Sequence, residues 1–205
     1  RYVGHPKALE INPDTGNKEK RSARELLGFS PTDTVVAVLP GSRASEVSLI
    51  GPVFFHAAKI LSGILSCKFV VPATNPNRSE QIKRLWESIA PNLSVVVTDN
   101  SMTAMKASDT VLVKSGTATL EAMLLRRPMV VAYRLNELSY KLVSRFIKTQ
   151  RFALPNILAD KDLVPEFIQH TAKPEILAKA IFELLREPQE KLMSEFDCVH
   201  KKLRL

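Results

Sequence analysis

The stretch that decides the fold reads TVVAVLPGSRASEV over residues 34–47. Its first half is a compact apolar run without alternation of apolar and polar residues, which is typical of a strand buried on both faces. The run ends at Pro40-Gly41, and a helical pattern begins a few residues later. A buried strand, a tight turn and a helix form the repeating unit of a parallel α/β sheet.

Four more apolar runs predict further strands, at 68–72, 94–98, 110–113 and 129–133. Helical patterns lie between and after them, and we expect helices at about 44–65, 77–89, 102–107, 117–125, 137–148, 163–169, 174–186 and 189–203. The alternation of strand and helix through five units predicts an α/β fold with a doubly wound, mostly parallel sheet. Asp109 is interpreted as the residue that starts the fourth strand, and Trp86 as a core residue.

The segments before the first strand predict little regular structure. Residues 1–13 are interpreted as an interdomain linker segment and residues 14–18 as a polar loop, so we expect one domain over 14–205 that ends in helices. The chain begins at Arg1 rather than at Met, and we interpret it as a piece of a longer protein. No apolar run has the length that a bilayer requires, and the amino terminus lacks a signal-peptide pattern.

The composition favours anionic partners and disfavours several classes of site. A formal charge of +8 suits a phosphorylated substrate, nucleic acid or an anionic membrane surface. No aromatic residues interleave with the scattered basic residues, so binding to nucleic acid is not favoured. Cys67 and Cys198 cannot build a disulfide framework, which indicates a reducing, cytoplasmic compartment. The four histidines show no metal-ligand spacing, so we expect no structural zinc.

The first candidate site is the turn Gly41-Ser42-Arg43, directly after the first predicted strand. Ligands of open parallel sheets bind beyond the carboxyl ends of the strands. Glycine permits close approach by a ligand, a helix start offers free N–H groups to an anion, and Arg43 adds a planar donor fork suited to phosphate. The alternative is a plain turn with Ser45 as the N-cap and Arg43 in solvent. From this element alone, both interpretations stay open.

The second candidate site is the turn after the fourth predicted strand, Ser115-Gly116-Thr117, with Thr119 and Glu121 in the helix that follows. Its backbone and hydroxyl groups can bind phosphate, and the Glu121 carboxylate can accept both hydroxyls of a ribose. The alternative is that Thr117 caps the helix and Glu121 only favours its amino-terminal end. Two such turns on one sheet make the binding interpretation stronger than either turn alone.

The order of these motifs resembles a known family. Residues 99–102, 107–109, 115–121 and 127–131 resemble the donor domain of GT-B glycosyltransferases, the Rossmann-like half of those enzymes. Val3-Gly4-His5-Pro6, residues 39–43 with Glu46-Val47, residues 115–121 and Leu154-Pro155-Asn156-Ile157-Leu158 are more closely similar to the lipid A disaccharide synthase family. The resemblance covers essentially the whole chain, and the motifs occur in the family's order.

The resemblance implies an inverting transfer of 2,3-diacylglucosamine from UDP-2,3-diacylglucosamine to 2,3-diacylglucosamine 1-phosphate, which forms a β-1,6-linked disaccharide. By the family pattern, the donor site is formed by these residues: Gly41, Ser42 and Arg43 at the diphosphate, Ser115, Gly116, Thr117 and Thr119 in the same pocket, Glu121 at the ribose, Asn100 and Met102 at the uracil, and Asn156 at the cleft edge. Arg43 then stabilises charge on the departing UDP.

The resemblance also implies conditions on activity and location. No cofactor or metal is needed, because UDP is a good leaving group and Arg43 and helix termini can stabilise its charge. The family's amino-terminal domain, which holds the acceptor and the general base, is not in this sequence, so this chain alone is expected to bind UDP weakly and to transfer nothing. The parent protein is expected at the cytoplasmic face of the inner membrane as a peripheral protein, and it can be a homo-oligomer.

Other interpretations are weighed beside this one. Another UDP-sugar enzyme of GT-B architecture is the nearest, such as a lipid II N-acetylglucosaminyltransferase or a UDP-N-acetylglucosamine 2-epimerase. A non-catalytic nucleotide-binding or partner-docking module is a second, and the loss of UDP binding on substitution of Arg43 or Glu121 separates a binding site from a scaffold. A basic nucleic-acid-binding domain is a third, and it predicts an affinity that depends steeply on salt.

Overall fold

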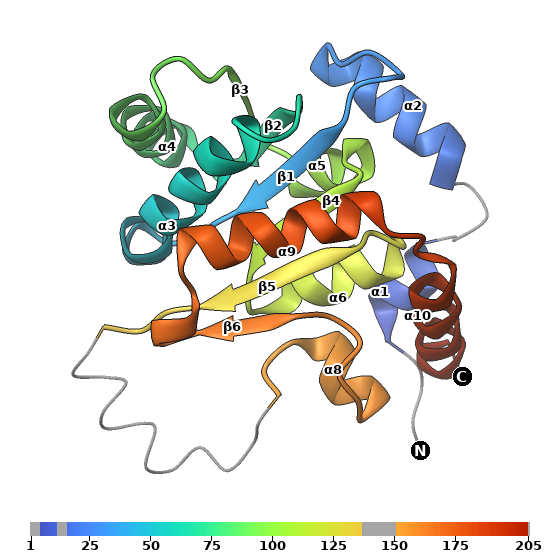
Figure 1. Ribbon diagram of the computed structural model, residues 1–205. Coiled ribbons are helices and arrows are strands. Elements are labelled where there is room, and N and C mark those ends of the chain that lie inside the picture. Colours follow the sequence, from blue (N-terminus) through green and yellow to red (C-terminus); the bar gives the residue numbers. More distant parts are fainter. Residues whose placement is uncertain (1–4, 12–15, 137–150, 205) are drawn as a thin grey trace.

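A six-stranded, wholly parallel sheet forms the centre of the molecule (Figure 1). The computed structural model describes residues 5–11, 16–136 and 151–204. The strand order is β3-β2-β1-β4-β5-β6. The strands span Val35–Leu39 (β1), Lys68–Pro72 (β2), Val95–Thr98 (β3), Thr110–Lys114 (β4), Met129–Tyr133 (β5) and Glu166–Ile168 (β6).

Helices cover both faces of this sheet, as Figure 1 shows. The layer of α3, α4 and α9 packs on one face, and α2, α5, α6 and α10 pack on the other. The helices span Pro6–Glu10 (α1), Gly16–Leu27 (α2), Ala44–Ser62 (α3), Pro76–Ile89 (α4), Ser101–Ala107 (α5), Thr117–Leu124 (α6), Leu154–Ala159 (α8), Pro174–Arg186 (α9) and Glu190–Leu203 (α10).

Burial on both faces explains the unbroken apolar run of β1. Val36 and Val38 belong to the core that α3 and α9 cover, whereas Val35, Ala37 and Leu39 belong to the core on the α5 and α6 side. All five residues are buried, so neither face of the strand tolerates a polar residue. The prediction of a doubly wound, mostly parallel sheet is confirmed, and the five predicted strands are present with small differences at their ends.

The sheet order places the two candidate turns next to each other. β1 pairs with both β2 and β4, so the strand order reverses between β1 and β4. At such a switch point the helices that follow the two strands diverge to opposite faces and leave a crevice beyond the carboxyl ends. Leu39 pairs in register with Val113, so the turns that follow these residues leave the sheet at the same level.

One of the predicted helices is wrong. Residues 163–169 were expected to be helical, but the structure has strand β6 over Glu166–Ile168 and a 3₁₀ turn at Gln169–Thr171. The carbonyl of Pro165 accepts a hydrogen bond from Val131 N, and the next residues continue as the edge partner of β5. Tertiary pairing therefore overrides the local helical pattern. The helix predicted at 137–148 lies outside the described residues.

The described part of the predicted linker, residues 5–11, packs onto the domain instead. Residues 6–10 form α1, and Ala8 is fully buried. His5 N donates to Leu203 O at 2.8 Å, and His200 Nε2 lies 2.8 Å from Ala8 O, so His5 and α1 are held against α10. Helix α2 begins at Gly16, inside the segment predicted as a polar loop. Lone apolar residues between polar ones give too weak a pattern to predict such contacts from sequence.

Helix α3 is the long core helix of one face. It has the length and apolar composition of a membrane span, contrary to the expectation that no run reaches that length. Half of that stretch is buried in the protein, where the helix packs against α4 and α9. Phe55 on α3 packs edge-to-face against Trp86 with ring centroids 5.0 Å apart, and the Trp86 indole N–H donates to Leu93 O at 2.6 Å. The assignment of Trp86 to the core is confirmed.

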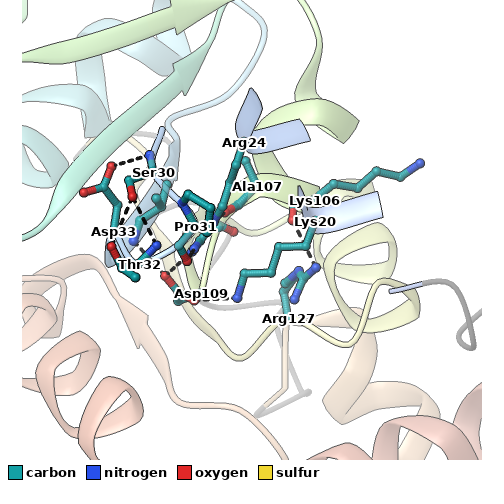
Figure 2. A network of polar contacts seen from close by, with 12 residues as sticks. Lys20, Arg24, Ser30, Pro31, Thr32, Asp33, Lys106, Ala107, Asp109 and Arg127 are labelled. Carbon is teal, nitrogen blue, oxygen red and sulfur yellow. Dashed lines mark hydrogen bonds and ion pairs between the residues drawn. The ribbon is translucent and has the colours of Figure 1, made fainter. Parts of the chain in front are cut away.

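A polar network centred on Asp109 fastens α2 to the amino-terminal edge of the sheet (Figure 2). Asp109 Oδ2 accepts from Val35 N at 2.7 Å and from Arg24 Nη2 at 2.8 Å, and Oδ1 pairs with Lys20. The buried Arg24 also donates to Ala107 O at 2.9 Å. Asp109 precedes β4 directly, as predicted, and its single carboxylate links α2, β1 and β4.

Candidate functional site

A cleft of about 410 Å³ lies beyond the carboxyl ends of the central strands. Both turns singled out by the sequence contribute to it, together with the segments after β2 and β3. Its polar lining consists of Gly41, Ser42, Arg43 and Glu46 after β1, Thr74 after β2, Asp99 and Ser101 after β3, and Lys114, Ser115, Gly116, Thr117 and Glu121 at and after the end of β4. Arg43 and Glu121 therefore face one space.

The first turn is closed by a carboxylate from the helix it precedes. Glu46 Oε2 accepts from Ser42 N at 3.0 Å and from Arg43 N at 3.2 Å. Arg43 is the N-cap of α3, so the alternative in which Ser45 caps the helix is wrong. The Arg43 side chain is 82% exposed and contacts Glu46 Oε1 at 3.4 Å. Its guanidinium keeps most of its donors available to a bound anion.

Gly41 is required by Glu46. Its φ is +114°, and a Cβ at this position would lie 2.4 Å from Glu46 Oε2 and 2.8 Å from Glu46 Cβ. The sequence suggested that this glycine makes room for a ligand, and the structure shows that it makes room for a side chain of the protein.

Replacing Gly41 with alanine is expected to destabilise the fold by about 1–3 kcal/mol, because both the backbone conformation and the Glu46 stem resist a Cβ. Gly16→Ala is the matched control, since a Cβ there meets nothing within 4 Å. Urea unfolding of the two variants measures the difference. Equal stability of Gly41→Ala and Gly16→Ala would contradict this account of the turn.

The second turn leaves the sheet at Lys114 and enters α6. Ser115 N donates to Ala132 O at 2.9 Å, and Ser115 Oγ donates to Phe152 O at 2.8 Å, which fixes the turn to β5 and to the segment before α8. Gly116 is the N-cap of α6 and no side chain caps this end, so the alternative role of Thr117 as the cap is wrong. Thr117 instead lines the cleft.

Glu121 lies one turn into α6 and reaches the cleft with a side chain that is 20% exposed. Its Oε1 lies 3.5 Å from Lys7 Nζ of α1. The sequence did not associate Lys7 with the site, because residues 1–13 were expected to be a linker. An ionised carboxylate in this position can accept two hydroxyl donors of a sugar.

Glu46 and Lys114 form the electrostatic centre of the cleft. Lys114 Nζ lies 3.3 Å from Glu46 Oε1 and 5.1 Å from the centre of the Tyr133 ring. Burial acts to raise the pKa of Glu46, but the Arg43 N–H and Lys114 outweigh it, so the pKa lies below its ordinary value. Glu46 is therefore charged at neutral pH. Lys114 was not predicted as a site residue, although it directly precedes the Ser115 turn.

Three predicted site residues, Thr119, Asn100 and Met102, are not among the residues that line the cleft. Thr119 is fully buried, and its hydroxyl donates to Gly116 O at 2.7 Å. Asn100 caps α5 by accepting from Thr103 N at 3.0 Å, and Met102 packs into the core. The turn after β3 reaches the cleft through its neighbours Asp99 and Ser101, and its contact with uracil stays a prediction.

Asn156 contradicts its predicted place at the cleft edge. It is 1% exposed, and its Oδ1 accepts from Leu163 N at 2.8 Å and from Val164 N at 2.9 Å. Its Nδ2 donates to Val164 O and to Glu166 Oε1. Every polar atom of the side chain is thus used to hold the loop between α8 and β6. Within the described residues, no group of three His, Cys, Asp or Glu side chains could hold a metal ion.

A family model and the curated relatives of this chain agree on one family. A family model described as lipid-A-disaccharide synthetase matches residues 1–204. Lipid-A-disaccharide synthases of Azotobacter vinelandii and Hahella chejuensis are both 44% identical to this chain over its whole length, which is 53% and 52% of theirs. The chain therefore spans about half the length of these curated relatives.

The solved structures support the same fold. The structure of WaaG, a glycosyltransferase involved in lipopolysaccharide biosynthesis, superposes with a TM-score of 0.57 at 14% identity, over 97% of this chain and 50% of that one. At this identity the likeness shows the fold alone. The predicted GT-B type of α/β fold is confirmed.

Proposed function

Because the chain belongs to the lipid-A-disaccharide synthetase family, we propose that it forms the donor-binding part of a lipid A glycosyltransferase. The proposed reaction transfers 2,3-diacylglucosamine from its UDP donor to 2,3-diacylglucosamine 1-phosphate, with a β-1,6 linkage in the product. In this role the chain binds the UDP moiety and stabilises it as the leaving group.

One observation supports this proposal above the others. Arg43 from the turn after β1 and Glu121 from the helix after β4 line a single cleft at the switch point of the sheet. A guanidinium suits a diphosphate, a carboxylate suits the ribose hydroxyls, and the cleft volume of about 410 Å³ lies in the range of small-ligand sites.

The chemistry proposed for the cleft is electrostatic. As the bond between the sugar and UDP breaks, negative charge grows on the diphosphate. The exposed Arg43 guanidinium can stabilise that charge by donating hydrogen bonds to the phosphate oxygens. The α6 start at Gly116 adds the positive end of a helix to the same space. Preplaced donors lower the barrier because they need little reorganisation during the reaction.

The proposed cellular setting follows from the substrates. Both carry acyl chains, so we place the parent protein at the cytoplasmic face of the inner membrane, in peripheral contact with the lipid. We leave a homo-oligomer open as its assembly state. Cys67 and Cys198 are both free, which agrees with a reducing compartment. Burial raises the pKa of the Cys67 thiol to about 11, so it stays protonated at neutral pH.

A titration of this chain with nucleotides tests the proposal. We expect UDP to bind more tightly than uridine, because the diphosphate adds contacts with cations. We also expect UDP to bind more tightly than ADP, because the turn after β3 is proposed to contact uracil. Isothermal calorimetry or amide chemical shifts measure these affinities. Absence of UDP binding would favour a partner-docking module, and a stronger, steeply salt-dependent affinity for DNA or RNA would favour a nucleic-acid-binding domain.

A further inference from the structure

A second cationic side chain, that of Lys114, lines the cleft beside Arg43, where the diphosphate is proposed to bind. Lys114 is the last residue of β4, and its side chain lines the cleft with 18% of its surface exposed. Its Nζ lies 3.3 Å from Glu46 Oε1. Among the strands of the described residues, β4 is the one whose carboxyl-terminal residue is charged, and that is the end of the strand that borders the cleft.

Lys114 and Arg43 converge on the same oxygen atom. Arg43 Nη1 lies 3.4 Å from Glu46 Oε1, the atom that Lys114 Nζ also contacts. The two cations come from neighbouring strands, since Leu39 and Val113 are paired in register. Both cations therefore lie within 3.4 Å of one oxygen atom at the lining of the cleft, and a diphosphate, which carries several anionic oxygens, can contact both.

Other contacts hold Lys114 in this position. Its Nζ lies 5.1 Å from the centre of the Tyr133 ring and 3.3 Å from Ser115 O. Glu46 is itself fixed by the N–H groups of Ser42 and Arg43. Together Arg43, Lys114 and Glu46 carry one more positive than negative charge, so this end of the cleft favours an anion even while Glu46 stays in place.

We propose that Lys114 is a second diphosphate-binding residue, which acts beside Arg43. This assignment rests on the proposed function, because it takes a nucleoside diphosphate as the ligand of the cleft. Lys114 contacts the phosphate oxygens and leaves the uridine to the turn after β3 and to Glu121. Its effect is therefore confined to the charged part of the ligand.

The test compares Lys114→Met with the unsubstituted chain in titrations with UDP and with uridine. Methionine keeps the apolar stem against Tyr133 and removes the charge. We expect the dissociation constant for UDP to rise about tenfold and that for uridine to change less than about twofold. Lys106→Met is the matched control, since Lys106 is also half-buried and pairs with one carboxylate, Glu19, at 3.2 Å, outside the cleft.

A second variant, Lys114→Arg, keeps the charge and is expected to retain most of the UDP affinity. If Lys114→Met binds UDP as tightly as the unsubstituted chain, or loses UDP and uridine by the same factor, the assignment is wrong while the proposed function stands. If Lys114→Arg loses as much affinity for UDP as Lys114→Met, the cleft requires the shape of lysine rather than its charge, and the assignment is also wrong. If the unsubstituted chain binds no UDP, the proposed function fails and this inference fails with it.

Discussion

Replacing Asp109 with alanine is expected to lower the free energy of unfolding by about 2–4 kcal/mol, although Asp109 lies outside the candidate cleft. Its carboxylate is the charged partner of Arg24, whose side chain is only 6% exposed, and of Lys20 (Figure 2). Alanine would leave the Arg24 guanidinium buried without a counter-ion and the Val35 N–H without its acceptor. Unpaired buried charges cost far more than surface ion pairs contribute.

Urea unfolding of the variant measures this loss, with Asp162→Ala as the control. Asp162 pairs with Arg151 at 2.8 Å, but its side chain is 81% exposed, so its removal is expected to cost less than about 1 kcal/mol. Similar small losses for both variants would mean that the Asp109 network does not fasten α2 to the sheet.

The sheet itself could be predicted because its strands are buried on both faces. The run at 34–40 could be identified as a strand because it is short, rich in β-branched residues and bounded by Pro40-Gly41. The position of the cleft followed as well, because the carboxyl ends of parallel strands share one edge of a sheet. Gly41, Arg43, Ser115 and Glu121 were placed in one site on this basis, and the structure brings them together.

The elements and side-chain directions that could not be predicted from the sequence depend on contacts between distant parts of the chain. Strand β6 exists because β5 offers it a free edge, and α1 exists because the last helix binds it. The direction of a side chain is likewise invisible in a motif. Asn156 belongs to a motif of the family but turns into its own loop, and Thr119 turns back onto Gly116. Lys114 was overlooked because the predicted strand ended at residue 113 and the prediction chose the residues after it, whereas β4 extends to Lys114 and brings its side chain to the cleft.

The second large effect is expected at the two ends of the proposed ligand. Arg43→Ala should raise the dissociation constant for UDP about tenfold to a hundredfold, because it removes a charged donor fork from the diphosphate. It should leave stability nearly unchanged, since the side chain is 82% exposed. Glu121→Ala should weaken UDP and uridine alike, because both ligands carry the ribose. Arg84→Ala and Glu183→Ala, from exposed ion pairs within single helices, are the controls.

The most direct test of the account is therefore this crossed titration of Arg43→Ala and Glu121→Ala with UDP and uridine. If the turns after β1 and β4 form one site for a uridine diphosphate, Arg43→Ala loses affinity for UDP alone, and Glu121→Ala loses affinity for both ligands. UDP affinities in both variants equal to those of the Arg84→Ala and Glu183→Ala controls would contradict the account, because the two turns would then share a cleft without binding the nucleotide.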